Sequence, residues 1–315
     1  MNSFRHSLPQ LDSRLFLTDG GIETSLIFNE GIELQDFAAF DLLRTEAGRA
    51  ALLKYFRDYV AIAKRFEVGL ILETATWRAN PDWATRLGYD KEALATANQG
   101  SVDLLKELRV DFPHELVLSG CIGPRGDGYI PGALMSSRQA ADYHRAQVET
   151  FAGAGADLVT AITMNYVEEA IGVAQAAKDA GMPAVISFTV ETDGTLPSGE
   201  SLPDAIQEVD AATGAHPAYY MLNCAHPTHF EETIRSGSAG WLGRIRGLRA
   251  NASRMSHAEL NESPTLDTGD PSELAGQYAN FIKLLPKLNV MGGCCGTDHR
   301  HVSRIAEVCS PLFAG

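Results

Sequence analysis

The protein has 315 residues, of which 45% are hydrophobic and 21% are charged, a composition that predicts a folded globular protein and excludes a disordered one. Its 40 acidic and 26 basic side chains give a net charge of -14, which argues against nucleic acid and anionic membranes as partners. Because the first residues lack the apolar core of a signal peptide and no segment approaches the roughly 20 apolar residues that span a bilayer, we expect a cytoplasmic protein.

Eight apolar, β-branched segments alternate with amphipathic segments along the chain, a pattern typical of βα units around a parallel sheet. The strands are expected at 15–20, 69–76, 116–124, 157–163, 183–190, 218–225, 245–253 and 290–296, and the helices between them include 45–66, 91–109, 137–154 and 167–180. Eight such units favour a closed (β/α)8 TIM-type barrel, one domain over residues 1–315. No GxGxxG sequence opens a helix after the first strand, which disfavours a dinucleotide-binding sheet.

Polar and sulfur-containing residues follow several of the predicted strands. They are Asp19, Gly20 and Gly21 after the first strand, Glu73, Thr74 and Thr76 at the second, Asn223 and Cys224 at the sixth, and Cys294 and Cys295 at the eighth. Active sites of such barrels lie at the carboxyl ends of the strands, so we expect these residues to share one face. Two long loops at 21–43 and 125–136 are expected to form walls or lids over it.

The odd number of cysteines, five in a chain without a secretion signal, argues against a disulfide framework and leaves thiols available for a metal. Cys121 and Cys309 are expected to be small buried hydrophobic residues. Cys224, Cys294 and Cys295 are expected to bind one Zn2+, with the fourth tetrahedral position open. The glycines around the adjacent pair allow the sharp backbone turn that this requires. A vicinal redox pair is the alternative interpretation of Cys294 and Cys295.

At these residues the sequence resembles the homocysteine S-methyltransferase family. The similar segments are TDGGIETSLIF at 18–28, ETATWRAN at 73–80, SFTVETDGTLPSGESL at 187–202, LNC at 222–224 and GGCCGT at 292–297, and they span nearly the whole chain. The resemblance implies that Cys224, Cys294 and Cys295 hold zinc. It also implies that Asp19, Gly20, Gly21 and Thr74 help to bind the amino acid, and Asn223 is expected beside them.

The implied reaction transfers a methyl group from a sulfonium donor, S-methylmethionine or S-adenosylmethionine, to homocysteine, giving methionine. Zinc would lower the pKa of the acceptor thiol, about 8.5 when free, so no protein side chain has to act as nucleophile. The chain is too short for the additional modules of cobalamin-dependent enzymes, which favours a sulfonium donor. Trp77, Tyr129 and acidic residues of the first loop such as Glu23 are candidates for contacting that cation.

One position departs from the family pattern, because Ile162 stands where family members have a glutamate that meets the substrate's ammonium group. An ammonium without an acceptor would lose roughly 1.5 to 3 kcal/mol. Either Glu73 at the neighbouring strand end replaces that glutamate, or the acceptor is another small thiol. The alternative from a different functional class is a non-catalytic zinc or redox-sensing protein. The sequence leaves open whether the chain forms a homo-oligomer.

Overall fold

The computed structural model describes residues 3–110, 112–263 and 265–313, and its centre is a closed barrel of eight parallel strands in chain order. The strands are β1 (Phe16–Leu17), β2 (Gly69–Glu73), β3 (Leu116–Ile122), β4 (Leu158–Met164), β5 (Ala184–Phe188), β6 (Pro217–Asn223), β7 (Ile245–Ala250) and β8 (Val290–Gly293). Pairing of β1 with β8 closes the barrel. The predicted TIM-type barrel is therefore confirmed. Most strands end before their predicted carboxyl ends, because the rim residues leave the sheet and turn into the loops.

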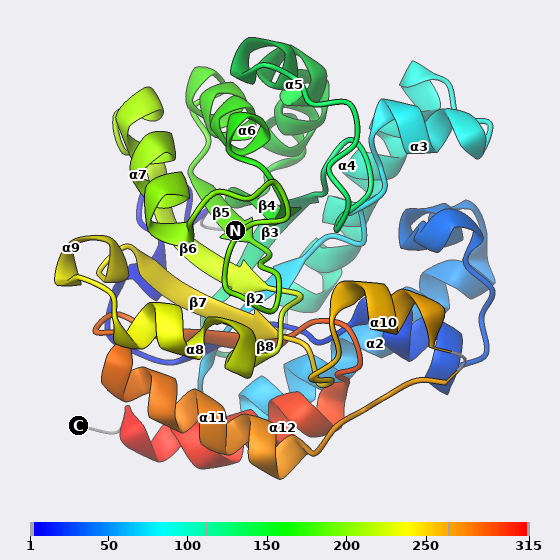
Figure 1. Ribbon diagram of the computed structural model, residues 1–315. Helices are drawn as coiled ribbons and strands as arrows, with labels where there is room; N and C mark the ends of the chain where they lie inside the picture. Colours follow the sequence, from blue (N-terminus) through cyan, green and yellow to red (C-terminus); the bar gives the residue numbers. More distant parts are fainter. Residues whose placement is uncertain (1–2, 111, 264, 314–315) are drawn as a thin grey trace.

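Helices form a layer around the barrel (Figure 1). The longer ones are α2 (Glu46–Phe66), α4 (Lys91–Arg109), α5 (Ser137–Ala154), α6 (Val167–Asp179), α7 (Leu202–Thr213), α8 (Pro227–Arg235), α11 (Pro271–Leu284) and α12 (His299–Cys309). Several begin at a side chain that caps the first turn, such as Thr45 before α2, Asp90 before α4 and Ser136 before α5. In the described part of the chain, no helix combines the length and the apolarity needed to cross a membrane.

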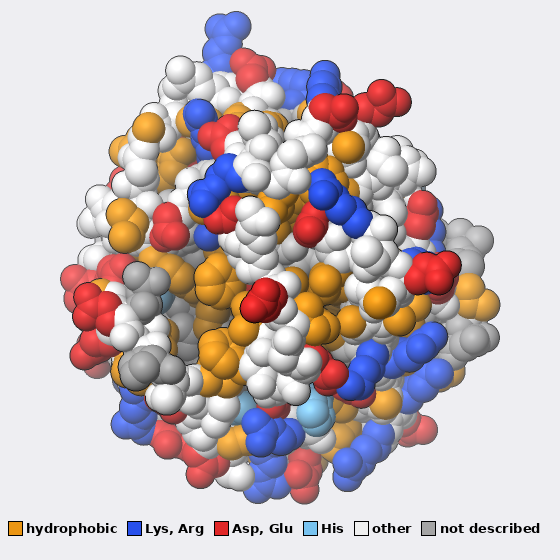
Figure 2. All heavy atoms as spheres, turned by 90° about the vertical axis from the view of Figure 1, so that its right-hand side faces the viewer, with side chains coloured by type: hydrophobic (Ala, Val, Ile, Leu, Met, Phe, Trp, Pro, Cys, Tyr) orange, Lys and Arg blue, Asp and Glu red, His pale blue; other side chains and the backbone are white. Residues whose placement is uncertain are grey.

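Short helical segments lie in the connections, before β1 and after α12. They are α1 (Ile22–Thr24), α3 (Pro81–Arg86), α9 (Ala239–Leu242), α10 (His257–Glu262) and the 3-10 or π segments η1 (Pro9–Leu11), η2 (Ser25–Asn29), η3 (Gln35–Phe37), η4 (Ala39–Arg44) and η5 (Ser310–Leu312). Four of them, α1, η2, η3 and η4, make up the long connection after β1. The face at the carboxyl ends of the strands is turned to the viewer in Figure 2, where hydrophobic side chains gather across the middle and charged ones lie mostly toward the edge.

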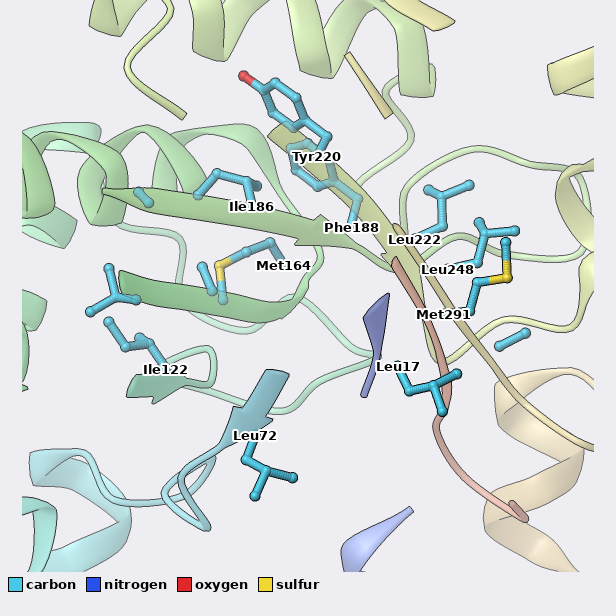
Figure 3. Packing of buried hydrophobic residues seen from close by; sticks show 14 of the residues in the cluster. Leu17, Leu72, Ile122, Met164, Ile186, Phe188, Tyr220, Leu222, Leu248 and Met291 are labelled. Carbon is cyan, nitrogen blue, oxygen red and sulfur yellow. The ribbon is translucent and has the colours of Figure 1, made fainter. Parts of the chain in front are cut away.

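Side chains along each strand point alternately outward and inward, and they belong to two different hydrophobic clusters. Residues such as Leu72 and Ile186 point outward and pack with the helices, as Figure 3 shows for this outer cluster. Residues such as Ile71, Val117 and Val185 fill the inside of the barrel. Toward the carboxyl ends the inward positions become polar, so the apolar core ends where the candidate site begins.

The hydroxyl of Tyr278, on α11, connects two strands that lead to this site. It accepts a hydrogen bond from the backbone N–H of Ala250 at 2.8 Å and lies 2.7 Å from the carbonyl oxygen of Gly292. Tyr278→Phe leaves both buried backbone groups without this partner, so we expect the free energy of unfolding to fall by about 1 to 3 kcal/mol. Urea denaturation measures the change, and an unchanged midpoint would contradict this role.

Candidate metal centre at the carboxyl ends of the strands

The structure brings the three predicted cysteines together. Cys224 follows β6 directly, Cys294 and Cys295 follow β8, and their sulfur atoms all lie within 4.8 Å of one another. The sulfurs of Cys224 and Cys295 are 4.0 Å apart. Cys224 and Cys294 are joined by a disulfide, and Cys295 is a free thiol. This pairing was not predicted, since the alternative considered from the sequence joined Cys294 with Cys295.

The backbone beside Cys224 is held in an uncommon conformation. Cys224 has φ 53° and Thr163, at the end of β4, has φ 64°, values that non-glycine residues rarely adopt. The Asn223 side chain secures this arrangement: its Oδ1 accepts hydrogen bonds from Thr163 N at 3.0 Å and from Ser187 Oγ at 2.6 Å. Its Nδ2 donates to Thr163 Oγ1 at 2.8 Å. Asn223 thus aims Cys224, and such strain is typical of a site whose geometry matters.

The loop after β1 packs directly on the cysteine turn. Thr24 Oγ1 accepts a hydrogen bond from Gly296 N at 3.0 Å, and Gly21 N donates to the carbonyl oxygen of Thr297 at 3.1 Å. A Cβ atom at Gly21 would lie 2.6 Å from the carbonyl oxygen of Cys294. Only glycine permits this close approach, which fixes the first loop against the sulfurs.

A buried cluster of charges underlies the cysteines. Arg249, on β7, is 2.6 Å from Asp19 Oδ1 through Nη2 and 3.0 Å from Glu73 Oε2 through Nη1. Tyr55 donates a hydrogen bond to Asp19 Oδ2 at 3.0 Å. Burial raises the pKa of Asp19, and it raises the pKa of Glu73 to about 7, although Arg249 lowers both. Two carboxyl groups therefore share one guanidinium, and both predicted acidic residues already have a partner.

The residues at the ends of β2 and β4 form one wall of the site. Thr74 Oγ1 accepts a hydrogen bond from Cys121 N at 2.8 Å and is 2.6 Å from Thr76 Oγ1, so its hydroxyl links β2 to β3. Trp77 donates from Nε1 to the carbonyl oxygen of Ile162 at 3.3 Å. The Ile162 side chain is buried within the inner hydrophobic cluster and offers no polar group at this end of β4.

Tyr129 and His257, from the loops after β3 and β7, cover the sulfurs. Their rings stack with centroids 4.1 Å apart, and the Tyr129 hydroxyl is 3.3 Å from Cys295 Sγ. His257 Nε2 is 2.6 Å from the carbonyl oxygen of Cys224, to which it donates. Burial raises the pKa of Cys295, and the hydrogen bond from Tyr129 opposes that rise. Tyr129 is therefore placed to stabilise a thiolate at Cys295.

The arrangement of the sulfurs fits a thiolate metal site. Tetrahedral zinc with Zn–S bonds of about 2.3 Å places its sulfur ligands about 3.8 Å apart, close to the separation of Cys224 and Cys295. Cys224 and Cys294 can contribute as ligands only after their disulfide is reduced, because the ligand is a thiolate. In the ranges that the structure describes, no fourth His, Cys, Asp or Glu joins the group.

The remaining cysteines and the nearby histidines lie outside this sulfur group. Cys121 is buried in β3 and Cys309 in α12, as the sequence predicts. His226 caps α8 by accepting a hydrogen bond from Thr228 N at 3.3 Å. His301 is held in α12 by contacts with Asp298.

Sequence reasoning missed three residues of the site. Arg249 carries one signal, a charged residue near the carboxyl end of a strand, although β7 also contains Arg246. Tyr55 lies in the middle of a regular helix, and His257 follows a loop without periodicity, so neither carries a local signal for its contact.

A family model described as Homocysteine S-methyltransferase matches residues 16–309. The chain belongs to the homocysteine S-methyltransferase family. Homocysteine S-methyltransferase 3 of Arabidopsis thaliana is 26% identical over 188 residues, which are 58% of this chain and 51% of that protein. Betaine--homocysteine S-methyltransferase 1 of Rattus norvegicus is 24% identical over 260 residues, 76% of this chain and 61% of that one. The chain thus spans between half and two thirds of the length of these curated relatives.

Solved structures of this family share the fold. The homocysteine methyltransferase MmuM from Escherichia coli superimposes in its oxidized form with a TM-score of 0.77 at 19% identity, covering 98% of this chain and 99% of that one. Its metallated form gives a TM-score of 0.73 at 18% identity, with 96% and 98% covered. This homocysteine S-methyltransferase family member therefore has the architecture of the bacterial enzyme along nearly its whole length.

Proposed function

We propose that this chain transfers a methyl group from a sulfonium donor, S-methylmethionine or S-adenosylmethionine, to the thiol of homocysteine, giving methionine. The observation that carries the proposal is the convergence of three cysteine sulfurs from β6 and β8 at the mouth of a barrel of this family. Zinc is the proposed cofactor, held by Cys224, Cys294 and Cys295. When bound there it would supply Lewis acidity, which keeps an acceptor thiol deprotonated at neutral pH.

The protein's own residues would orient the acceptor and exclude water. Asn223 aims Cys224, while Tyr129 and His257 shield the sulfurs. We propose that Asp19, Gly20, Gly21, Glu73 and Thr74 form the acceptor side of the site. Alignment of the reacting atoms in a dry pocket then accounts for most of the rate enhancement, because the thiolate needs no additional general base.

On the donor side, Tyr129 is better placed than Trp77 to contact a sulfonium cation. The guanidinium of Arg78 lies 4.1 Å from the centre of the Trp77 ring, so this ring already contacts a cation. The Tyr129 hydroxyl lies 3.3 Å from Cys295 Sγ, and we propose that its ring borders the path of the methyl group. This assignment supports a cationic donor, since an aromatic face attracts positive charge.

A panel of thiols and donors tests the proposal on the reduced, zinc-loaded protein. Homocysteine and 4-mercaptobutyrate, which lacks the amino group, are each combined with S-methylmethionine, S-adenosylmethionine and betaine, and the products are resolved by mass. We expect methionine from homocysteine and a sulfonium donor, with kcat/KM about tenfold or more above that for 4-mercaptobutyrate. Equal transfer to both thiols would identify a different acceptor class, and no transfer to any thiol would refute the proposal.

The Cys224–Cys294 disulfide favours a second candidate function, redox sensing without catalysis. This function requires that the bond form and break reversibly while the reduced, zinc-loaded protein transfers no methyl group. Counting free thiols before and after mild oxidation, alongside the transfer assay, distinguishes the two functions.

A further inference from the structure

Asn165 connects the end of β4 to the loop that covers the sulfurs. It is 1% exposed, and its Nδ2 donates a hydrogen bond to the carbonyl oxygen of Asp127 at 2.9 Å. Asp127 Oδ1 in turn accepts hydrogen bonds from the backbone N–H groups of Tyr129 at 2.8 Å and of Ile130 at 3.1 Å. A chain of hydrogen bonds therefore leads from β4 to the backbone of Tyr129, whose hydroxyl lies 3.3 Å from Cys295 Sγ.

Asn165 is itself fixed, because it follows β4 directly and its backbone is bound. Its carbonyl oxygen accepts hydrogen bonds from Ser198 Oγ at 2.8 Å and from Ser198 N at 3.3 Å. It lies two residues after Thr163, whose backbone N–H donates to Asn223 Oδ1 at 3.0 Å. The same short segment therefore holds Asn223, which aims Cys224, and the loop that covers the sulfurs.

The two preceding residues of this loop are held in the same way. Arg125 N donates a hydrogen bond to Oε1 of Glu169, which is buried in α6, at 2.7 Å. The carbonyl oxygen of Gly126 accepts one from Arg78 Nη1 at 2.8 Å. The bond from Asn165 is therefore the last of three such contacts, at three consecutive residues, before the loop reaches the sulfurs.

We infer that Asn165 is a positioning residue for methyl transfer, which acts through Asp127 to hold Tyr129 in place over Cys295. The inference rests on the proposed function and adds a residue that acts through others. Because hydrogen bonds hold the loop backbone on both sides of the turn, the Tyr129 ring has little freedom to move away. A small displacement of a group beside the reacting atoms can lower the rate strongly, so the loop serves as a wall of fixed position.

The first test follows the position of Tyr129 without catalysis. In the protein with its disulfide intact, Cys295 is a free thiol, and peptide mapping by mass spectrometry gives the rate at which iodoacetamide alkylates it. We expect Asn165→Ala to raise this rate about threefold or more and to speed hydrogen exchange in residues 126–131 by a similar factor. Tyr129→Ala, which removes the cover, gives the upper limit of the alkylation rate.

Two further variants separate positioning from general destabilisation. Asn289→Ala is the matched control, because Asn289 is also buried and donates from Nδ2 to backbone carbonyl oxygens, but at the amino end of β8. It should lower the stability and leave both rates unchanged. Asp127→Ala removes the next contact of the chain at a half-exposed side chain, so it should fold and show the same two increases even where Asn165→Ala does not fold. An Asp127→Ala protein without them would by itself overturn the inference.

Activity of the reduced, zinc-loaded protein supplies the second readout. Because Tyr129 lies on the proposed donor side, we expect Asn165→Ala to lower kcat/KM for the sulfonium donor about tenfold. The Kd of homocysteine, measured by isothermal titration calorimetry, should change less than about twofold, since Asn165 does not act on the acceptor side.

Each other outcome contradicts the inference. Alkylation and exchange rates equal to those of the wild type would overturn it, as would unchanged kcat/KM in a variant whose loop has been released, or an equal weakening of both substrates. Failure of the proposed function itself would look different, because the wild type would then transfer no methyl group while the alkylation and exchange results would stand.

Discussion

Replacing Cys295 with serine is expected to abolish zinc binding and, with it, methyl transfer. A serine hydroxyl stays protonated at neutral pH and is a poor ligand for a metal that prefers thiolates, so only two sulfurs would remain. Loss of a metal that stabilises the reacting thiolate by several kcal/mol should lower kcat/KM by about 10³-fold or more. Zinc per chain, measured by mass spectrometry of the metal after gel filtration under reducing conditions, should fall from one to near zero.

Cys309→Ser provides the matched control for this experiment. Cys309 is a free cysteine like Cys295, but it lies buried in α12, outside the sulfur group. Its substitution should cost some stability and leave zinc content and activity intact. A Cys295→Ser protein that still held one zinc would show that another group completes the site, and the assignment of the three cysteines would fail.

The arrangement of the cysteines could be foreseen because it depends on topology more than on distances. In a barrel of eight parallel strands, all carboxyl ends meet on one face, so residues that follow β6 and β8 must come near each other. The Gly-Gly-Cys-Cys-Gly segment also carries a local signal for a turn, which the positive φ of Gly296 bears out. The barrel itself followed from the repeated alternation of strand and helix patterns.

The contacts among side chains from distant segments could not be foreseen in the same way. The disulfide between Cys224 and Cys294 depends on distances of a few ångström within the converged site, which strand spacing does not fix. The stacking of Tyr129 on His257 joins the loop after β3 to the start of α10, and neither segment has a periodic pattern that predicts this contact. Arg249 is visible as a charged residue in a strand, but its two partners are far away in the sequence: Asp19 follows β1 and Glu73 ends β2.

Among the residues around the site, Arg249 is the one whose replacement should lower the stability of the protein most. Arg249→Met keeps most of the volume and removes the only cation near Asp19 and Glu73 in the described barrel interior, which leaves two buried carboxyl groups uncompensated. It also removes hydrogen bonds from Nε to the carbonyl oxygen of Gly293 and from Nη2 to that of Gly20. Removing one partner of a buried ion pair typically costs about 3 to 5 kcal/mol. We expect the free energy of unfolding of Arg249→Met to fall by that order at pH 8.

The loss of stability in Arg249→Met should depend on pH. The direction of this dependence distinguishes an effect of charge from an effect of packing. Burial already raises the pKa of both carboxyl groups, to about 7 for Glu73 against an ordinary 4.5, and the removal of Arg249 raises them further. A carboxyl group with a higher pKa in the folded state takes up its proton there first, so lowering the pH through 7 stabilises the folded variant. Urea denaturation should therefore show the deficit of Arg249→Met shrinking from pH 8 to about pH 5.

Arg254→Met is the matched control, because Arg254 pairs with Glu273 at the surface and its loss should cost about 1 kcal/mol or less at either pH. A deficit in Arg249→Met that stays constant with pH would mean that the missing hydrogen bonds and packing, and not the two unpaired carboxyl groups, destabilise the barrel.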